Sequence, residues 1–331
     1  MNLSQPLLAM LSDGHFHSGA VLGEKLGVGR AAIWKQCQHL IALGLEVHAV
    51  RGRGYRLVTP IELLNNQQIE SILSPLTRDA LDAVHVHFDV DSTNAWLLRQ
   101  PQRHAKVCLA EQQTAGRGRR GREWISPLAS NLYLSLGWSF RVDASGLGGL
   151  SLAFGVAVKR ALAKLGLSQC GLKWPNDIVN QGQKLGGILI ELRGEVGGSC
   201  QMVVGIGLNI DMPKTAAEDI DQAWTDILHC LKQEHGQAPT VFSRNQLAAV
   251  MIDELVATCR ACDEGNLNAY LEEWQLANVH AGQKVTLHTP DGKQVHGLMQ
   301  GIDDNGALLL VREGAVKRFS CGEVSLREPT R

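Results

Sequence analysis

Residues 113–124 read Gln-Thr-Ala-Gly-Arg-Gly-Arg-Arg-Gly-Arg-Glu-Trp, a stretch in which glycines alternate with arginines. Glycine lets the backbone approach a ligand closely and adopt positive φ angles. Guanidinium groups bind phosphate through paired hydrogen bonds that an ammonium group cannot make. Neighbouring arginines also repel one another. The stretch therefore predicts a lid that is mobile until it orders around a phosphate-bearing ligand.

The glycine spacing also matches G-x-G-x-x-G, the dinucleotide-binding fingerprint. That motif has to open a helix whose N-terminus faces the pyrophosphate. Here Trp-Ile-Ser-Pro follows at 124–127, and then a strand-like run at 131–136, so we reject the dinucleotide interpretation. Two alternatives stay open for the stretch alone. Besides a lid, the stretch could be a nucleic-acid patch, because clustered arginine suits any phosphate, or a solvated surface loop.

The composition is that of a globular protein. The chain has 331 residues, a net charge of −1, and 44% apolar and 20% charged residues, which predicts two or three domains. The first 14 residues lack the pattern of a signal peptide, and the apolar window 147–167 is interrupted by cations, as expected of a buried helix. The one C-x-x-C pair, Cys259 and Cys262, has no second pair nearby, which favours buried thiols and a cytoplasmic location.

Residues 1–63 predict a winged helix-turn-helix domain. A helix from Pro6 to Leu11 and a second helix capped by Ser18 precede a third helix from Arg30. Strands at 45–50 and 55–58 follow and are joined by a basic turn. The positions expected on the inner helix faces are Val21, Leu22, Leu26, Ile33, Cys37, Leu40 and Ile41.

A recognition helix in the major groove and a wing on the backbone make a DNA-reading arrangement. The alternative is a small helical domain with ordinary exposed cations. A single copy meets one half-site, so useful specificity would require a dimer. The residues expected to face DNA are Arg30, Trp34, Lys35, Gln38, Arg51 and Arg53.

Two motifs between residues 84 and 180 place polar groups at strand ends, where ligand sites gather. A strand at 84–90 runs into Ser92-Thr93-Asn94, which either caps the next helix or meets a polar ligand ring; both can hold. Residues 173–177, Lys-Trp-Pro-Asn-Asp, bring together a cation, an amide and a carboxylate. Asn176 and Asp177 either hold Mg²⁺, which prefers a few protein oxygens with waters and phosphates, or form an ordinary turn.

Two further motifs carry glycines beside strands. Lys184 precedes Leu-Gly-Gly, and the glycines open space beside a lysine that by itself would be read as solvated. Gly205 and Gly207 weaken the strand that begins at residue 203, unless a group lies against its backbone. Residues 212–223 predict a second flexible loop, with Ile220 and Trp224 as its apolar members.

The remaining chain completes three domains. Helices are expected over 240–275, and short strands with Asp-Gly and Asn-Gly turns from residue 281 predict a small β-barrel. The fold class is therefore α+β multidomain, with boundaries at 1–63, 64–275 and 276–331.

Together, the motifs at 116–122, 173–177, 184–187 and 205–209 resemble those of the bifunctional biotin protein ligases that also repress the biotin operon. Their order and spacing match over essentially the whole chain. The resemblance implies a central mixed-sheet catalytic domain like that of class II aminoacyl-tRNA synthetases and an SH3-like C-terminal barrel. Gly29 is a departure, because a serine or threonine often precedes the recognition helix in the family.

The resemblance also implies a reaction. The family forms biotinyl-5′-AMP from biotin and ATP with Mg²⁺, and transfers biotin to a lysine of biotin carboxyl carrier protein. The adenylate-bound homodimer then binds the biotin operator. Three alternatives remain: a lipoate ligase with the same central fold, a ligase that no longer represses, and a transcription factor that only senses biotin. The arginine-rich run argues against the lipoate ligase.

Both substrates of the first step are negative, so we expect Lys184 and Arg119 to neutralise charge, with Mg²⁺ near Asn176 and Asp177, and Asp177 to assist the proton loss of the second step. The residues implied for binding biotin and its adenylate are Ser92, Thr93, Asn94, Gln113, Gly116, Arg117, Gly118, Arg119, Arg122, Trp124, Lys173, Asn176, Lys184, Gly187, Gly205, Asn209, Ile220, Trp224 and Arg327.

Overall fold

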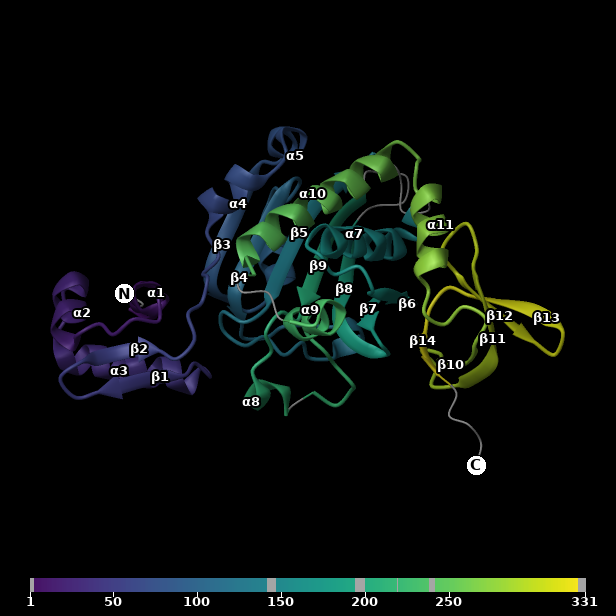
Figure 1. The fold of residues 1–331 in the computed structure, drawn as a ribbon. Helices are drawn as coiled ribbons and strands as arrows, with labels where there is room; N and C mark the ends of the chain where they lie inside the picture. Colours follow the sequence, from purple (N-terminus) through teal and green to yellow (C-terminus); the bar gives the residue numbers. More distant parts are fainter. Residues whose placement is uncertain (1–2, 142–146, 194–199, 219, 238–241, 327–331) are drawn as a thin grey trace, which may run out of the picture.

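The structure is a computed structural model that describes residues 3–141, 147–193, 200–218, 220–237 and 242–326. Figure 1 shows three units in chain order: a small N-terminal helical unit, a central sheet with its helices, and a C-terminal sheet. None of the described helices combines the length and apolarity needed to cross a membrane.

The N-terminal unit is the predicted winged helix-turn-helix. It contains α1 (Ser4–Leu11), α2 (Gly19–Leu26), α3 (Arg30–Ala42) and the antiparallel hairpin of β1 (Val47–Val50) and β2 (Gly54–Leu57). The Ser18 hydroxyl accepts a hydrogen bond from the Val21 N–H, and so caps α2 as expected. Gly29 provides no side-chain cap for α3.

Two of the expected inner positions of this unit are wrong. Val21 and Ile41 are each 42% exposed, whereas Leu22 and Leu40 are fully buried. Helices this short cover only a narrow stripe, and a residue next to the buried one points about 100° away from it. The buried face of each helix is therefore narrower than the run of apolar residues in the sequence suggests.

The central unit is built on a mixed seven-stranded sheet in the order β3-β4-β5-β9-β8-β7-β6. Only β3 and β4 run parallel, and the other neighbours are antiparallel. The strands are β3 (Ala83–Val90), β4 (Lys106–Gln113), β5 (Leu132–Phe140), β6 (Gly171–Lys173), β7 (Asp177–Asn180), β8 (Gln183–Arg193) and β9 (Cys200–Leu208).

The two faces of this sheet are covered differently. Long helices α7 (Leu150–Lys164) and α10 (Arg244–Asp263) pack on one face, where they form the main core with residues such as Val107 and Leu109. Alternate residues such as Cys108 point to the other face, which α6 (Thr93–Leu98) covers only in part. We call the part of that second face that α6 leaves uncovered the open face.

The remaining helices are shorter. They are α4 (Asn66–Ile72), α5 (Pro75–Ala80), α8 (Lys214–Ala217), α9 (Ile227–His235) and α11 (Asn268–Ala277), with a 3-10 turn, η1, at Arg119–Gly121. The sequence did not predict α9. Cys259 and Cys262 are buried in α10, as predicted, and burial raises the pKa of Cys262 to about 11.

The C-terminal unit is an antiparallel five-stranded sheet in the order β13-β12-β11-β10-β14, as the turn pattern predicted. Its strands are β10 (Lys284–His288), β11 (Gln294–Ile302), β12 (Leu308–Arg312), β13 (Ala315–Phe319) and β14 (Glu323–Leu326). Residue 327, with the expected Arg327 contact, lies outside the described residues.

A buried ion pair holds the segment between the first two units. An Arg244 Nη1 donates to Glu111 Oε2 at 2.7 Å, and the two side chains are only 6% and 4% exposed. Arg244 also donates to the Glu62 carbonyl, and Glu111 accepts from the Leu64 N–H. The connecting segment is therefore bonded to the sheet and to the start of α10, so it is not a free linker.

Replacing Arg244 by methionine leaves the Glu111 carboxylate buried without a cation. We expect a loss of about 3–5 kcal/mol in the free energy of unfolding, measured by urea unfolding. The control is Arg260→Met on the exposed face of the same helix, which should change stability by less than about 0.5 kcal/mol. A loss below about 1 kcal/mol for Arg244→Met would contradict the role of this ion pair.

Candidate active site

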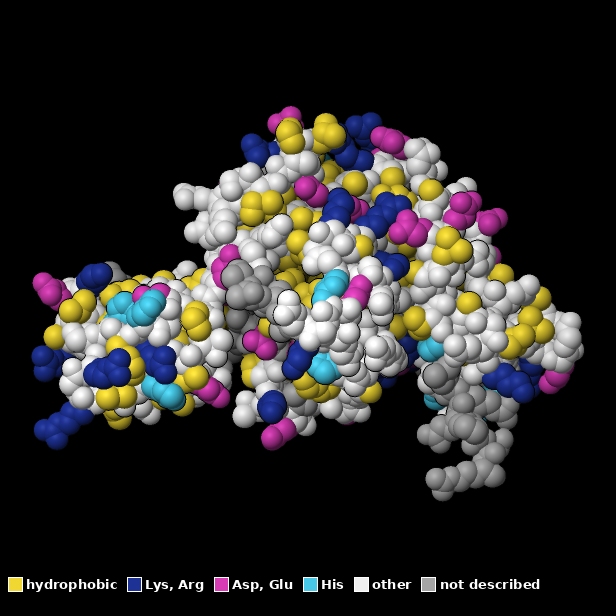
Figure 2. All heavy atoms as spheres, in the orientation of Figure 1, with side chains coloured by type: hydrophobic (Ala, Val, Ile, Leu, Met, Phe, Trp, Pro, Cys, Tyr) yellow, Lys and Arg dark blue, Asp and Glu magenta, His cyan; other side chains and the backbone are white. Residues whose placement is uncertain are grey.

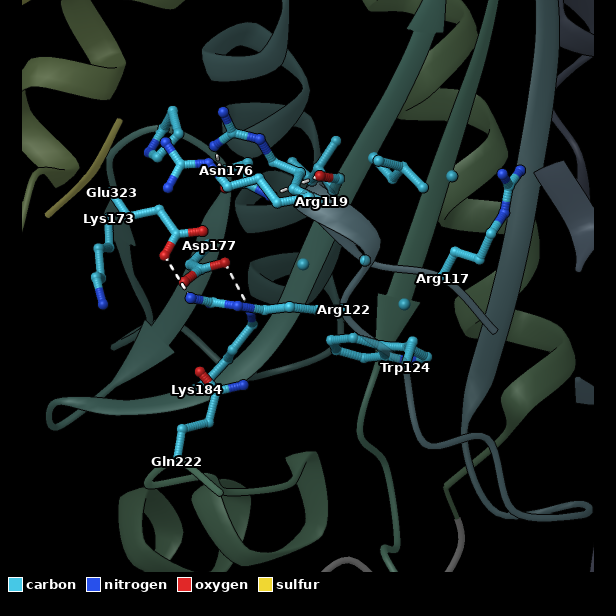
Figure 3. A pocket seen from close by; sticks show the side chains of 18 of the residues that line it. Arg117, Arg119, Arg122, Trp124, Lys173, Asn176, Asp177, Lys184, Gln222 and Glu323 are labelled. Carbon is cyan, nitrogen blue, oxygen red and sulfur yellow. Dashed lines mark hydrogen bonds and ion pairs between the residues drawn. The ribbon is translucent and has the colours of Figure 1, made fainter. Parts of the chain in front are cut away.

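A cavity of about 560 Å³ opens on the open face of the central sheet. Figure 3 shows its labelled side chains, which come from the arginine loop (residues 116–122) and Trp124 just after it, from the segment of β6 to β8, from Gln222 in the loop at 212–223 and from the C-terminal unit. Predicted site residues that line it are Ser92, Thr93, Asn94, Gln113, Arg117, Gly118, Arg119, Arg122, Trp124, Lys173, Asn176, Asp177, Lys184, Gly187 and Gly205.

One end of the cavity has a polar floor, which consists of Thr93, Asn94 and Gln113, with the fully buried Ser135 hydrogen-bonded beneath it. The Thr93 N–H donates to Gln113 Oε1 at 2.9 Å, and the Ser135 hydroxyl lies 2.6 Å from Asn94 Oδ1. Ser92 caps α6 through the Ala95 N–H. Both interpretations of the Ser-Thr-Asn run therefore hold, because the run starts a helix and also faces the cavity. No sequence pattern pointed to Ser135.

Glycines make room for this floor. A Cβ on Gly205 would collide with the Asn94 amide, and one on Gly207 would lie 2.6 Å from Trp124 Cε2. The Trp124 indole can therefore lie flat over β9 only because that strand lacks side chains there. This explains the glycines that made the strand look weak in the sequence.

The arginine loop is held by acceptors from other elements. Arg117 pairs with Glu191 at 3.2 Å, Arg122 pairs with Glu323 at 2.7 Å, and Arg119 donates to Asn176 Oδ1 at 3.1 Å. Burial lowers the pKa of Arg119. Mutual repulsion in the loop is thus offset by contacts to several elements. The ligand-dependent mobility of the loop stays a prediction.

Lys184 and Asp177 lie at the other end of the cavity. The Lys184 Nζ is 2.9 Å from Asp177 Oδ1, and the two side chains are 18% and 16% exposed. The ammonium group also lies 5.7 Å from the centre of the Trp124 ring. The lysine that looked solvated in the sequence is therefore a partly buried cation that faces the cavity, as is Lys173 on β6.

The C-terminal unit forms one wall of the cavity, which the sequence did not indicate beyond Arg327. His288 and Ser325 line it and lie within hydrogen-bond distance of each other at 3.2 Å. Glu323 adds the acceptor for Arg122. These residues sit on short strands with no motif of their own, so only the tertiary arrangement shows that they reach the site.

Comparisons with known proteins match all three units. Residues 4–56 match the HTH domain, residues 87–209 the Biotin/lipoate A/B protein ligase family, and residues 280–327 the Biotin protein ligase C terminal domain. The chain is 41% identical to the bifunctional ligase/repressor BirA of Escherichia coli (strain K12), over 97% of this chain and 96% of that protein. The chain belongs to the bifunctional ligase/repressor family.

Other members of the family agree with this assignment. BirA of Bacillus subtilis (strain 168) is 28% identical to the chain over 98% of both proteins. The biotin protein ligase from Aquifex aeolicus in complex with biotin and ATP has a TM-score of 0.62 and 25% identity, and covers 75% of this chain and 100% of that one. The predicted fold class is thereby confirmed.

Four implied binding residues of the ligase family do not line the cavity in this structure. Gly116 packs against Trp124 and Ser126, and the buried Asn209 donates to the Thr225 carbonyl at 3.0 Å. Ile220 and Trp224 are half-buried beside the loop, where the Lys184 N–H donates to the Ala223 carbonyl. Asn209 thus supports the segment that pairs with Lys184. Ligand contacts of all four stay predictions.

The six residues expected to face DNA are all exposed on the N-terminal unit. Figure 2 shows Lys and Arg side chains distributed over the visible face of this unit. The guanidinium carbon of Arg53 lies 4.1 Å from the centre of the Phe16 ring. This cation–π contact orients one arginine of the wing.

The glycine requirement of the floor can be tested without any ligand. Gly205→Ala should lower the free energy of unfolding by about 1–3 kcal/mol, because the buried Asn94 cannot move aside without cost. Gly187→Ala is the control, since its Cβ would meet Lys184 Cε at an ordinary 3.5 Å. Urea unfolding of both variants gives the comparison, and equal stabilities would contradict the proposed collision.

Proposed function

We propose that this chain forms biotinyl-5′-AMP from biotin and ATP in the cavity, and transfers the biotinyl group to a lysine of a biotin carboxyl carrier protein. The observation that carries the proposal is the polarity of the cavity. Thr93, Asn94 and Gln113 give the cavity an uncharged hydrogen-bonding floor, and Arg119, Lys173 and Lys184 add cations to its lining. A ligand with a polar ring and an anionic tail matches this arrangement.

The floor favours biotin over lipoate, the second substrate class of the matched family. The ureido ring of biotin has two N–H donors and a carbonyl acceptor, whereas the dithiolane ring of lipoate has neither. Buried polar groups left without partners cost free energy. Thr93, Asn94 and Gln113 would therefore penalise lipoate, and the apolar Trp124 ring would cover the rest of the bicycle.

The first step joins two anions, because the biotin carboxylate attacks the α-phosphorus of ATP. Catalysis must then come largely from positioning and charge neutralisation. Lys184 and Arg119 supply fixed positive charge inside a partly buried cavity, where electrostatic interactions are stronger than in bulk water. Lys184 has to exchange its Asp177 partner, at least in part, for the carboxylate and phosphate of the reactants.

A Mg²⁺ ion fits the oxygen donors beside this cluster. The described residues contain no group of three or more His, Cys, Asp or Glu side chains suited to a metal ion. Mg²⁺, however, is often held by one or two protein oxygens together with phosphates and waters. Asp177 and the Asn176 amide oxygen would hold it, and its chemistry would be neutralisation of phosphate charge.

The second step is acyl transfer to an amine, which has to lose a proton. Asp177 pairs with Lys184 and faces the cavity. The carboxylate has two oxygens. With one of them on the metal ion, Oδ1 would be released when the ammonium group of Lys184 contacts the adenylate, and could then accept a hydrogen bond from the incoming lysine. We assign Asp177 this general-base role.

The repressor function would follow from the arginine loop. Adenylate would replace the protein acceptors of Arg117, Arg119 and Arg122, and so reorder a loop at the molecular surface. A homodimer that forms better with the reordered loop is then favoured by population shift. Two recognition helices in one dimer meet the two half-sites of a palindromic operator.

Pyrophosphate exchange tests the ligase proposal. We expect exchange that depends on biotin and is not supported by lipoate, and a rate about 10²–10³-fold lower for Lys184→Ala. Lys232→Ala on exposed α9 is the control, and circular dichroism verifies the fold of both variants. Exchange with lipoate alone, or a wild-type rate for Lys184→Ala, would refute the assignment.

A mobility shift with duplex DNA from the promoter of the biotin synthesis genes tests the repressor proposal. Binding should need biotin and ATP. Arg51→Gln should reduce the slope of log K against log salt by about 0.9 for each phosphate that the arginine neutralised. Lys284→Gln, on the C-terminal unit, should leave the slope unchanged. Equal DNA binding with and without biotin and ATP would contradict the proposed coupling to the ligand.

A further inference from the structure

A carboxylate that the sequence did not single out lies beneath the polar floor. Glu191 stands on β8, and its Oε2 accepts a hydrogen bond from Asn94 Nδ2 at 2.9 Å. The same carboxylate pairs with Arg117 of the arginine loop at 3.2 Å. Glu191 does not line the cavity itself, so it acts on a ligand only through its neighbours.

The first consequence concerns the amide of Asn94. An ionised carboxylate only accepts hydrogen bonds, so the Asn94 nitrogen has to face Glu191. The Leu189 carbonyl, at 3.3 Å from the same nitrogen, favours the same orientation through a longer contact. The Asn94 oxygen is thereby directed to Ser135. Because Asn94 is 3% exposed, no bulk water can reverse this arrangement.

The orientation then passes along the floor. The Ser135 hydroxyl has one proton, which goes to Asn94 Oδ1 at 2.6 Å. Ser135 Oγ can then only accept, and its donor is the Thr93 hydroxyl at 2.7 Å. Gln113 Oε1 is a second acceptor for this hydroxyl, but it lies further away, at 3.1 Å, and already accepts from the Thr93 N–H. With its proton committed to Ser135, Thr93 Oγ1 presents lone pairs to the cavity, where it can accept a hydrogen bond and cannot donate one.

We infer that Glu191 is a positioning and specificity-determining residue, which makes the floor an acceptor for a ligand N–H through the Asn94–Ser135–Thr93 chain. The inference rests on the proposed placement of the biotin ureido ring on this floor. The N–H of a cyclic urea can donate to Thr93 Oγ1. A ring oxygen in place of that N–H would bring its lone pairs against those of Thr93 Oγ1, which is unfavourable.

The test is calorimetric binding of biotin and of its two carbamate analogues, in each of which one ring N–H is replaced by oxygen. The wild-type protein should prefer biotin over at least one analogue by roughly 10²- to 10⁴-fold, because a site built to hydrogen-bond an N–H rejects the isostere without it. The glutamine side chain of Glu191→Gln can donate as well as accept a hydrogen bond, so the directions of the Asn94–Ser135–Thr93 hydrogen bonds can reverse. The preference of Glu191→Gln for biotin over the analogue should fall about tenfold or more, because the variant loses one hydrogen bond to a charged group.

Two further variants separate the possible roles of Glu191. Ser135→Ala interrupts the chain and leaves the Arg117–Glu191 pair in place, so it should reduce the preference as Glu191→Gln does. It also tests the inference if Glu191→Gln does not fold. Glu272→Gln, an exposed carboxylate on α11, controls for the change in net charge and should keep the wild-type ratio.

The outcomes are distinct. If Glu191→Gln weakens all three ligands equally, or if Ser135→Ala keeps the wild-type ratio, the inference is wrong and Glu191 only holds the arginine loop. If the wild-type protein does not bind biotin, the proposed function fails before the variants are compared.

Discussion

The site depends on a sheet face that carries no side chains where the ligand has to lie. Gly187 and Gly207 face each other across β8 and β9, and Gly205 lies two residues further along. Cross-strand neighbours of an antiparallel pair point to the same side, so the three missing side chains leave a depression beside Leu189, the partner of Gly205. Asn94 lies over Gly205, and Trp124 lies over Gly207. The cavity is the space that these contacts enclose.

The cationic groups around this surface share a second feature. Arg117, Arg122 and Lys184 each have a carboxylate partner within the protein. Such pairs keep the side chains near the site and limit the repulsion between them. They also mean that an anionic ligand exchanges one partner for another, which costs less than ordering free side chains. The carboxylates come from β7, β8 and β14, so these pairs connect the arginine loop and Lys184 to separate parts of the fold.

The buried pair of Arg244 and Glu111 connects the same sheet to the segment that follows the N-terminal unit. Glu111 lies two residues before Gln113 on β4. The same strand therefore bonds the connecting segment, through the Leu64 N–H, and contributes Gln113 to the polar floor. Arg244 also donates to the Asn131 carbonyl, and Asn131 accepts from the Ile210 N–H just before the loop at 212–223. The segment after the helix-turn-helix is therefore bonded to the strand that carries Gln113 and, through Asn131, to the start of the loop at 212–223.

The sequence by itself determined the three units and their order, and most of the site residues that it named line the cavity. Those signals are local: a capped helix pair with a basic wing, glycines beside arginines, and Asp-Gly turns between short strands. What it could not determine were contacts between residues far apart in the chain. Val21 and Ile41 were expected inside but are exposed. The width of a buried helix face depends on how the helices pack, which the sequence pattern does not show. Glu191, Ser135 and Glu323 reach the site because strand register and the docking of the C-terminal sheet bring them there, and no local pattern records such distances.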